Sequence, residues 1–564
     1  MPETKASNPA EGTQEKSQNE DFTSGSVTNN VELEAAGGGA EAAEPNTEFK
    51  PDRRFWLALA PILVLAAMVS LDGTAVTVAL PIMANDLGGT AIEAFWTGTS
   101  FLLSSTVLQL PTAAWSGIFG RMPVLVACSF LFLIGVIVAS VAKDFGTIFA
   151  GRVIQGVGGG GIILLNDIVV TDLVPMRQRG KYFGIVGGVW AFGSVCGPVI
   201  GGALAYEASW RGIFWMLIPF AAIVLVLIPM FLRLSKPPGS VIDKLRQFDW
   251  LGSLVFVGAA TCTLMPLTWG GVQYEWDQWQ TLFPLLLGIA VLFAFGIYES
   301  YVPKEPIMTM SLLRSYEMLY SLLSGIINAA IVYGSLYFLP LYFEAVQGYS
   351  PIISGVALFP ATFTLAPMSM VAGTVISKRG EYRWVTWFGW ILSTIGLGVM
   401  TMLDVDTTIA EWFFLTIFMG IGQGLLYTSL AIINQAAAPD KLMSHAISMF
   451  IFSRMLGQAL GVALSGLIFQ NQMRSNLLAT ATLADQAVEY SRDASSIVSF
   501  LHDMPNDVKK KELVQAYADS LKIVWAVMCA LSGAAMIGSF FVKHISLDRE
   551  HETEQGIHQE ESVE

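Results

Sequence analysis

The sequence predicts an all-α integral membrane protein with 14 transmembrane helices, and three observations lead to this fold class. The first is composition: 53% of the 564 residues are hydrophobic and only 13% are charged, roughly half the charged fraction of an average soluble domain. The second is a series of long apolar runs, and the third is an internal repeat. The composition by itself argues against a water-soluble enzyme.

The apolar runs are long enough to cross a bilayer as helices. A transmembrane helix needs about 20 apolar residues, because lipid offers no partner to backbone polar groups. Two runs, 55–82 and 148–170, qualify only if Asp72, Arg152 and Asp167 are tolerated inside them. Twelve more are charge-free over at least 19 residues: 94–120, 122–142, 182–206, 212–232, 250–274, 278–298, 318–343, 345–377, 384–403, 412–439, 455–473 and 523–542.

The short loops between these runs alternate in positive charge. One set holds fourteen Lys and Arg residues, and the other holds only Lys143 and Arg211. Cytosolic loops carry the excess of positive charge, so both termini are expected in the cytosol. The long loop 471–521 is then expected outside the cell.

The repeat divides the chain into two related halves. A shift of 264 residues maps spans 4 and 5 onto spans 12 and 13, which predicts six spans (53–235), two inserted spans (249–298) and six more (317–543). Parallel halves of this kind are typical of transporters that bind substrate between them. The matched positions are Gly156/Gly420, Gly158/Gly422, Gly160/Gly424, Pro175/Pro439, Gly193/Gly457, Gly197/Gly461 and Gly202/Gly466.

The formal net charge of −14 lies in the two tails. Residues 1–52 contain eleven acids and three lysines, and residues 544–564 contain seven acids and one arginine. Both tails are expected to be acidic, cytosolic and disordered, whereas the body between them is neutral. The four cysteines and five histidines show no metal-ligand spacing, so no metal site is predicted.

Two glycine-rich motifs lie within the spans. Gly197, Pro198, Gly201 and Gly202 in span 5 predict either a seam of close helix packing or a gating hinge. The run 156–161 is interpreted as close packing rather than a nucleotide loop, since no strand precedes it.

Four motifs carry a family resemblance. They are residues 71–81 in span 1, 152–160 in span 4, 172–180 in the next loop, and the span 5 Gly-Pro motif followed by 209–211. At these positions the chain resembles the major facilitator superfamily, within it the fourteen-span drug:proton antiporters, and especially their fungal members. The resemblance covers about residues 53–545 and implies export driven by the proton gradient, without a cofactor. No nucleotide-binding fingerprint is present that would make ATP the driver.

The chain departs from the family pattern in the loop between spans 2 and 3. The family's acidic residue is replaced by Gly117 and its final base by Met122, so that only Gly120 and Arg121 remain. The resemblance assigns these two residues to gating. The missing acid puts the family's cytosolic charge latch in doubt.

Four charged residues fall inside the spans: Asp72, Arg152, Asp167 and Arg454. Charges in lipid are costly and are usually functional. At about 1.5 Å per residue, Asp72 and Arg152 reach the same outer third of the membrane. They are therefore predicted to pair, either as a proton switch, in which Asp72 can bind a proton that Arg152 cannot lose, or as a static link between spans 1 and 4.

The other two charges lie near the cytosolic side. Asp167 is expected to anchor the loop that contains Arg177 and Arg179. Arg454 is expected either to snorkel to the cytosolic surface or to take part in gating.

Polar and aromatic side chains on apolar spans suggest a cavity for an amphipathic ligand. The candidates are Gln109, Gln155, Asn328, Tyr333, Tyr337, Gln423, Tyr427 and Asn434.

The sequence thus favours a proton-coupled exporter of small, largely hydrophobic organic molecules such as drugs, a mycotoxin or another secondary metabolite. Its expected partners are the substrate, protons and the lipid bilayer, with no nucleic acid, and it is expected to be a monomer. The family implies the cell membrane rather than the vacuolar membrane. Two alternatives stay open: a carrier of a polar solute, such as a basic amino acid or siderophore, and a transport-dead receptor. No cluster of catalytic residues indicates an enzyme.

Overall fold

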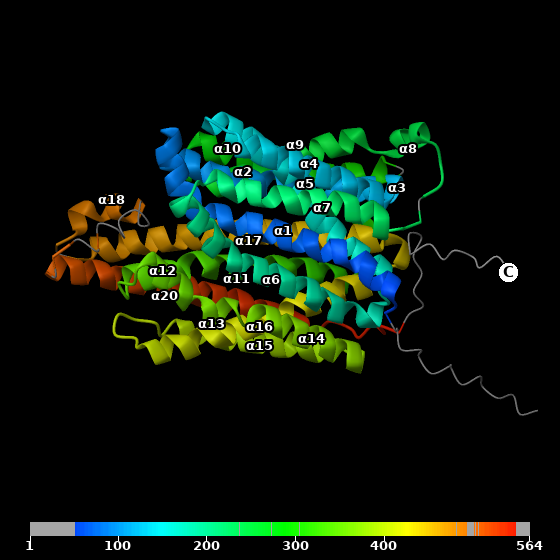
Figure 1. Cartoon of the computed structure of the whole chain (residues 1–564). Helices are drawn as coiled ribbons and strands as arrows, with labels where there is room; N and C mark the ends of the chain where they lie inside the picture. The colour runs from blue at the N-terminus through cyan, green and yellow to red at the C-terminus, as the bar shows by residue number, and fades with distance from the viewer. Residues whose placement is uncertain are drawn as a thin grey trace, which may run out of the picture. The chain divides into compact units, whose positions relative to one another are not determined.

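Long helices make up nearly all of the described chain (Figure 1). The computed structural model describes residues 51–548 except 236, 272, 304, 481, 493–500, 502–503 and 506. Extended pairing is confined to isolated bridges such as the one between Gly270 and Tyr274, and no β-strand is formed within the described residues. Helices dominate because each one satisfies its own backbone hydrogen bonds, as a span in lipid requires.

The helices follow one another with short connections. Three 3₁₀ turns interrupt the series at Met310–Arg314, Asp440–Leu442 and Ala484–Gln486. The α-helices are α1 (Arg53–Leu87), α2 (Ala91–Val107), α3 (Gln109–Phe119), α4 (Arg121–Ser140), α5 (Phe145–Leu173), α6 (Met176–Glu207), α7 (Arg211–Phe231), α8 (Val241–Gln247), α9 (Trp250–Trp269), α10 (Trp279–Tyr301), α11 (Tyr316–Ala345), α12 (Pro351–Ala357), α13 (Phe359–Thr362), α14 (Leu365–Arg379), α15 (Arg383–Met400), α16 (Ile409–Ala437), α17 (Met443–Leu478), α18 (Ala487–Arg492) and α20 (Val508–Ser539).

Among the described residues, 12 helical segments are long and apolar enough to span a membrane. Two of the 14 predicted runs are not among them. The run 94–120 is divided at Leu108, where backbone angles of φ −93° and ψ 2° separate α2 from α3. The run 384–403 forms α15, whose 18 residues are long enough but not apolar enough as a whole, because the helix begins at Arg383 and contains three Trp. The structure therefore supports 12 spans by length and composition.

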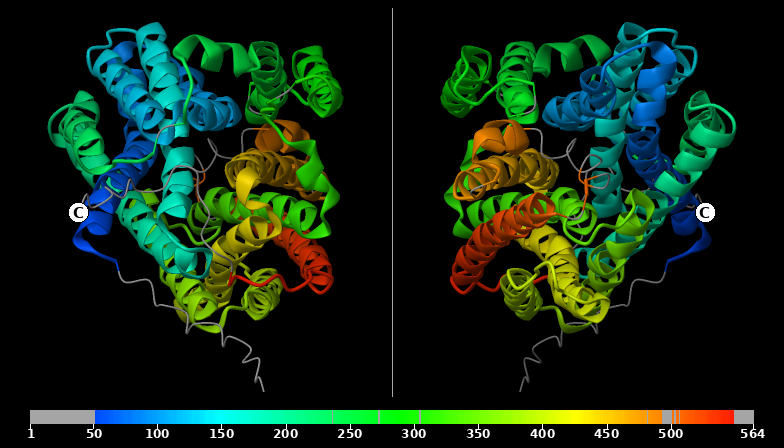
Figure 2. Two further views of the ribbon diagram at one scale, coloured as in Figure 1. Left: turned by 90° about the vertical axis from the view of Figure 1, so that its right-hand side faces the viewer. Right: turned by 90° about the vertical axis from the view of Figure 1, so that its left-hand side faces the viewer.

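The helices pack as two groups with matching internal contacts. In the first bundle, α1–α7, α1 packs on α6, α5 packs on both α2 and α4, and α4 packs on α7. In the second bundle, α11–α20, α11 packs on α17, α15 on α16 and α15 on α20. Viewed from either end, the early and late parts of the chain lie on different sides (Figure 2).

Glycines of the repeat make equivalent close contacts in the two bundles. A Cβ on Gly158 of α5 would lie 2.5 Å from the backbone nitrogen of Phe132 on α4. A Cβ on Gly422 of α16 would lie 2.8 Å from Cα of Ser393 on α15. Because both glycines bring a helix backbone against the preceding helix, the matched spacing in the sequence reflects a matched packing requirement.

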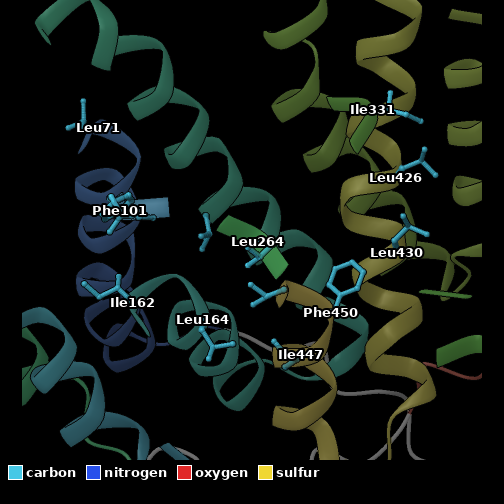
Figure 3. Packing of buried hydrophobic residues seen from close by; sticks show 14 of the residues in the cluster. Leu71, Phe101, Ile162, Leu164, Leu264, Ile331, Leu426, Leu430, Ile447 and Phe450 are labelled. Carbon is cyan, nitrogen blue, oxygen red and sulfur yellow. The ribbon is translucent and has the colours of Figure 1, made fainter. Parts of the chain in front are cut away.

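The inserted pair, α9 and α10, packs mainly on itself. Of its two helices, α9 also contacts α2 of the first bundle and α17 of the second. Figure 3 shows buried apolar side chains from this region, among them Leu264 of α9 and Phe450 of α17, and Leu71, Phe101 and Ile162 of the first bundle. The Phe256 ring of α9 packs on the Phe452 ring of α17, with centroids 5.3 Å apart. Apolar packing thus continues from one bundle to the other.

Two predicted boundaries differ from the structure. The expected loop 471–521 is helical up to Leu478 and again from Val508, because charged residues extend α17 and α20 beyond their apolar segments. The start of the acidic tail is also ordered: Ile545 N donates to Tyr382 Oη at 3.0 Å, and Asp548 pairs with Arg177 at 2.9 Å. Residues 1–50 and 549–564 lie outside the described part of the chain.

Candidate functional site

Asp72 and Arg152 form a buried ion pair between α1 and α5. Nη1 of Arg152 lies 2.9 Å from each carboxylate oxygen of Asp72, and the two side chains are 0% and 2% exposed. The same nitrogen donates to Gln155 Oε1 at 2.8 Å, and Nε donates to the carbonyl of Thr97 at 3.1 Å. The guanidinium lies 4.3 Å from the centre of the Phe101 ring. The structure therefore brings together the two charges expected to pair, and their role in proton coupling stays a prediction.

Glycines on α5 allow this pair to form. A Cβ on Gly160 would lie 2.7 Å from Cα of Ser105 on α2, and one on Gly156 would meet the carbonyl of Phe101. The absence of side chains at these positions lets α5 approach α2 closely. Arg152 can then reach the Thr97 carbonyl on α2 as well as Asp72 on α1.

Arg454 occupies a second charged position, on α17. Its guanidinium carbon lies 3.7 Å from the centre of the Tyr427 ring on α16 and 6.0 Å from that of Phe450. Its Nε is inaccessible and makes no hydrogen bond within the described residues. The charge of Arg454 acts on Asp167 of α5, but no contact within 4.0 Å joins the two groups. Arg454 is thus held against aromatic rings among the helices.

The expectation that Asp167 anchors the loop with Arg177 and Arg179 is wrong. Arg177 pairs with Asp548, and Arg179 donates at 3.0 Å to the carbonyls of Val174 and Thr171. Asp167 lies six residues before the end of α5, about 9 Å inside it. At that depth it lies within reach of the charge of Arg454, and the loop arginines are occupied elsewhere.

Arg121 connects the two bundles at the end where Arg177 and Arg179 also lie, here called the basic end. Its Nε lies 3.1 Å from the Asp172 carboxylate, and Nη2 donates to Ser444 Oγ of α17 at 3.1 Å. Asp172 therefore supplies the acid that is absent at Gly117. The sequence did not predict this pair. Its only signal was Asp172 itself, an acid that begins the 172–180 motif at the predicted cytosolic end of span 4.

The glycines of α6 form a packing seam against α1. The helix continues through Pro198 from Met176 to Glu207. A Cβ on Gly201 would lie 2.8 Å from Cα of Ala75, and one on Gly197 would collide with Thr74, whereas one on Gly202 would meet only a side chain, at 3.5 Å. Close packing is observed at Gly197 and Gly201, and a hinge at this motif remains a prediction.

Several predicted cavity residues are internal to the second bundle. Asn328 and Gln423 are 2% and 0% exposed and hydrogen-bond to each other at 2.5 Å. Asn434, 1% exposed, donates to Ser321 Oγ at 3.2 Å. A cavity of about 30 Å³ beside Gln423 is too small for an organic substrate. These three amides hold helices together. The sequence did not indicate this role, because uniformly apolar helices give no signal of which face is inward.

The remaining predicted cavity residues are two enclosed glutamines and three tyrosines that keep accessible surface. Gln155 is bound to Arg152, and Gln109 is 0% exposed, with no hydrogen-bond partner for its side-chain amide within the described residues. The tyrosines differ: Tyr337 is 53% exposed, and Tyr333 and Tyr427 are half-buried. Of the eight candidates, the three tyrosines keep accessible surface.

Comparison with known proteins decides the family. Residues 62–462 match the Major Facilitator Superfamily. The chain belongs to this superfamily. It is 44% identical to "MFS transporter L2" of Phoma sp. over 525 aligned residues. The alignment covers 93% of this chain and 88% of the relative. It is 34% identical to "Efflux pump FUS6" of Gibberella moniliformis, over 92% of this chain and 93% of the pump.

A third superfamily relative is the "Acurin A biosynthesis cluster MFS-type transporter" of Aspergillus aculeatus, 34% identical over 91% of this chain and 94% of the relative. Two solved structures share the fold. The human organic anion transporter MFSD10 gives a TM-score of 0.53 at 13% identity, over 86% of this chain and all of that one. The proton:xylose symporter XylE gives a TM-score of 0.52 at 14% identity, over 82% of this chain and 98% of the symporter. This superfamily member is therefore a multi-pass membrane transporter and not an enzyme.

Proposed function

We propose that the chain exports small amphipathic organic compounds, in particular secondary metabolites, in exchange for protons by alternating access. The names of its relatives support the direction and the class, since they include an efflux pump and a transporter of a biosynthesis cluster. In this proposal the helices form 14 spans arranged as 6+2+6. Counting α2 with α3 as one span and α15 as another adds two to the 12 apolar segments.

The observation that carries the proposal is the desolvated pair of Asp72 and Arg152. A carboxylate can bind and release a proton, whereas a guanidinium keeps its charge at every physiological pH. While Arg152 touches Asp72, the carboxylate stays charged. If α1 and α5 move apart, burial favours the neutral acid and Asp72 binds a proton. Such a cycle couples proton movement to a change in helix packing.

Contacts at the basic end support alternating access. Arg121 bonds to Ser444 across the two bundles, and a Cβ on Gly180 of α6 would lie 2.8 Å from Cα of Gly373 on α14. With the basic end in the cytosol, as the loop charges predict, these contacts close the cytosolic side. The opposite, inward-open state requires them to separate. The cell membrane is the location we propose.

The partnership of Arg121 with Asp172 weakens the alternative of a transport-dead receptor. That alternative drew its support from the missing acid at Gly117, and Asp172 provides a carboxylate for the same arginine. No specific observation favours the carrier of a basic amino acid, since the half-buried Arg454 places a cation against the Tyr427 ring.

The test begins with a deletion strain, whose secreted metabolites identify the exported compound. The purified protein in proteoliposomes is then assayed for uptake of that compound under an imposed pH gradient. Wild type is expected to respond to the gradient, and Asp72→Asn to lose the response. Asp86→Asn is the matched control, because it neutralises a half-exposed acid on the same helix. Gradient-driven transport by Asp72→Asn would overturn the proposed coupling.

A further inference from the structure

Arg454 is a cation inside α17 for which the described part of the chain supplies no ion pair. It lies eleven residues from the start of the helix at Met443, about 16 Å along it. Within the described residues it forms no ion pair and no hydrogen bond, and its Nε is inaccessible to solvent. A charge in this position is costly unless something binds it. Arg152 differs, since Asp72 already neutralises it.

The groups around Arg454 come from three other helices. The Tyr427 ring of α16 lies against the guanidinium at 3.7 Å, and the stem of Arg454 packs beside Gly325 of α11. The charge of Arg454 also acts on the Tyr333 phenol of α11 and on Asp167 of α5. Arg454, Tyr427, Tyr333 and Asp167 are all half-buried rather than enclosed. The guanidinium therefore keeps accessible donors on an aromatic surface between the two bundles.

These features select one ligand chemistry. A guanidinium presents a planar set of N–H donors that matches a carboxylate or enolate. Tyrosine rings pack on flat apolar groups and supply hydroxyls for hydrogen bonding. An organic cation would be repelled by Arg454, and a neutral compound would leave its donors without a charged partner.

We infer that Arg454, with Tyr427 and Tyr333, binds the acidic group of the transported compound, so that the substrate is an amphipathic organic acid with an unsaturated or aromatic body. This inference rests on the proposed function and narrows its substrate class. Asp167 opposes the ligand, because its carboxylate competes for the same cation.

The test measures binding rather than transport. Purified protein in detergent is titrated with pyrenebutyrate and with its methyl ester, and the melting temperature reports binding. The acid is expected to bind wild type at least tenfold more tightly than the ester, and Arg454→Gln to weaken acid binding about 10- to 100-fold. Arg454→Lys is expected to restore part of the preference, since it keeps the charge without the planar donors.

Two further variants make the test specific. Arg474→Gln removes an exposed arginine from the same helix and is expected to bind the acid like wild type. Asp167→Asn removes the competing anion and is expected to bind the acid more tightly, a direction that damage to the fold would not produce. The inference is wrong if the ester binds as well as the acid, if no binding occurs up to 1 mM, or if Arg454→Gln keeps the preference. Transport without proton coupling would defeat the proposed function and leave this binding result intact.

Discussion

The Asp72–Arg152 pair predicts a specific pattern of stability changes. Asp72→Asn keeps the shape of the side chain and removes its charge, which leaves a guanidinium that is 2% exposed without its anion. Breaking a buried pair from one side typically costs about 3–5 kcal/mol, because an uncompensated charge stays in a region of low dielectric constant.

The surroundings of Arg152 place the expected cost at the lower end of that range. Its Nε still donates to the Thr97 carbonyl, Nη1 still reaches Gln155, and the Phe101 ring still faces the charge. We therefore expect Asp72→Asn to lower the free energy of unfolding by about 3 kcal/mol.

A double-mutant cycle isolates the pair from its surroundings. The free energy of unfolding is measured by SDS titration in mixed micelles for wild type, Asp72→Asn, Arg152→Gln and the double variant. Because the double variant buries no unpaired charge, its loss should be smaller than the sum of the single losses by about 2–3 kcal/mol.

Two results would refute this reasoning. One is a double variant whose loss of unfolding free energy equals the sum of the single losses. The other is a loss below about 1 kcal/mol for Asp72→Asn, as expected of a solvated pair. The double variant also separates the two interpretations of the pair. A purely static link predicts that restored stability restores pH-driven transport, whereas a proton switch predicts that transport stays absent.

Two further predictions concern other parts of the first bundle. Hydrogen bonds from Trp210 and Arg211 hold the pKa of Asp86 below its usual 3.8, so the carboxylate stabilises the fold above that pH and loses this contribution as the pH falls through its lowered value. The stability difference between wild type and Asp86→Asn, measured by thermal unfolding, should be present at neutral pH and vanish in strong acid; a constant difference would contradict it. In the α6 seam, Gly201→Ala forces a Cβ into the α1 backbone and should cost about 1–3 kcal/mol. Gly202→Ala should change stability by less than about 1 kcal/mol in the same measurement, and equal losses would show that the seam is not closely packed there.

Several features of the site could be predicted because they depend on depth along a helix. Asp72 and Arg152 lie on helices whose directions the loop charges predict, and their matched depths implied a pair that the structure contains. Likewise, the glycine spacing of the repeat implied equivalent packing, which Gly158 and Gly422 show. A constant rise per residue makes such inferences possible without knowledge of the tertiary structure.

Other features depend on the rotation of each helix about its axis, and these were missed or wrong. Asn328 and Gln423 look like cavity residues in a linear sequence, yet they face each other inside the second bundle. Asp167 looks like an anchor for the nearby loop, yet it lies within reach of the charge of Arg454, 287 residues later in the chain. A helix that is apolar all round has no amphipathic pattern from which its inward face can be identified.

The sequence by itself determined that this protein is a helical membrane transporter with related halves. Lipid leaves long apolar runs no stable alternative to the helix, and close packing requires glycine at matched positions of the two halves. Only the tertiary structure decided which charges meet. Asp172 takes the place of the acid missing at Gly117, and Arg454 lies against the Tyr427 ring. Those contacts join residues far apart in the chain, and they depend on how closely and at what rotation the helices pack.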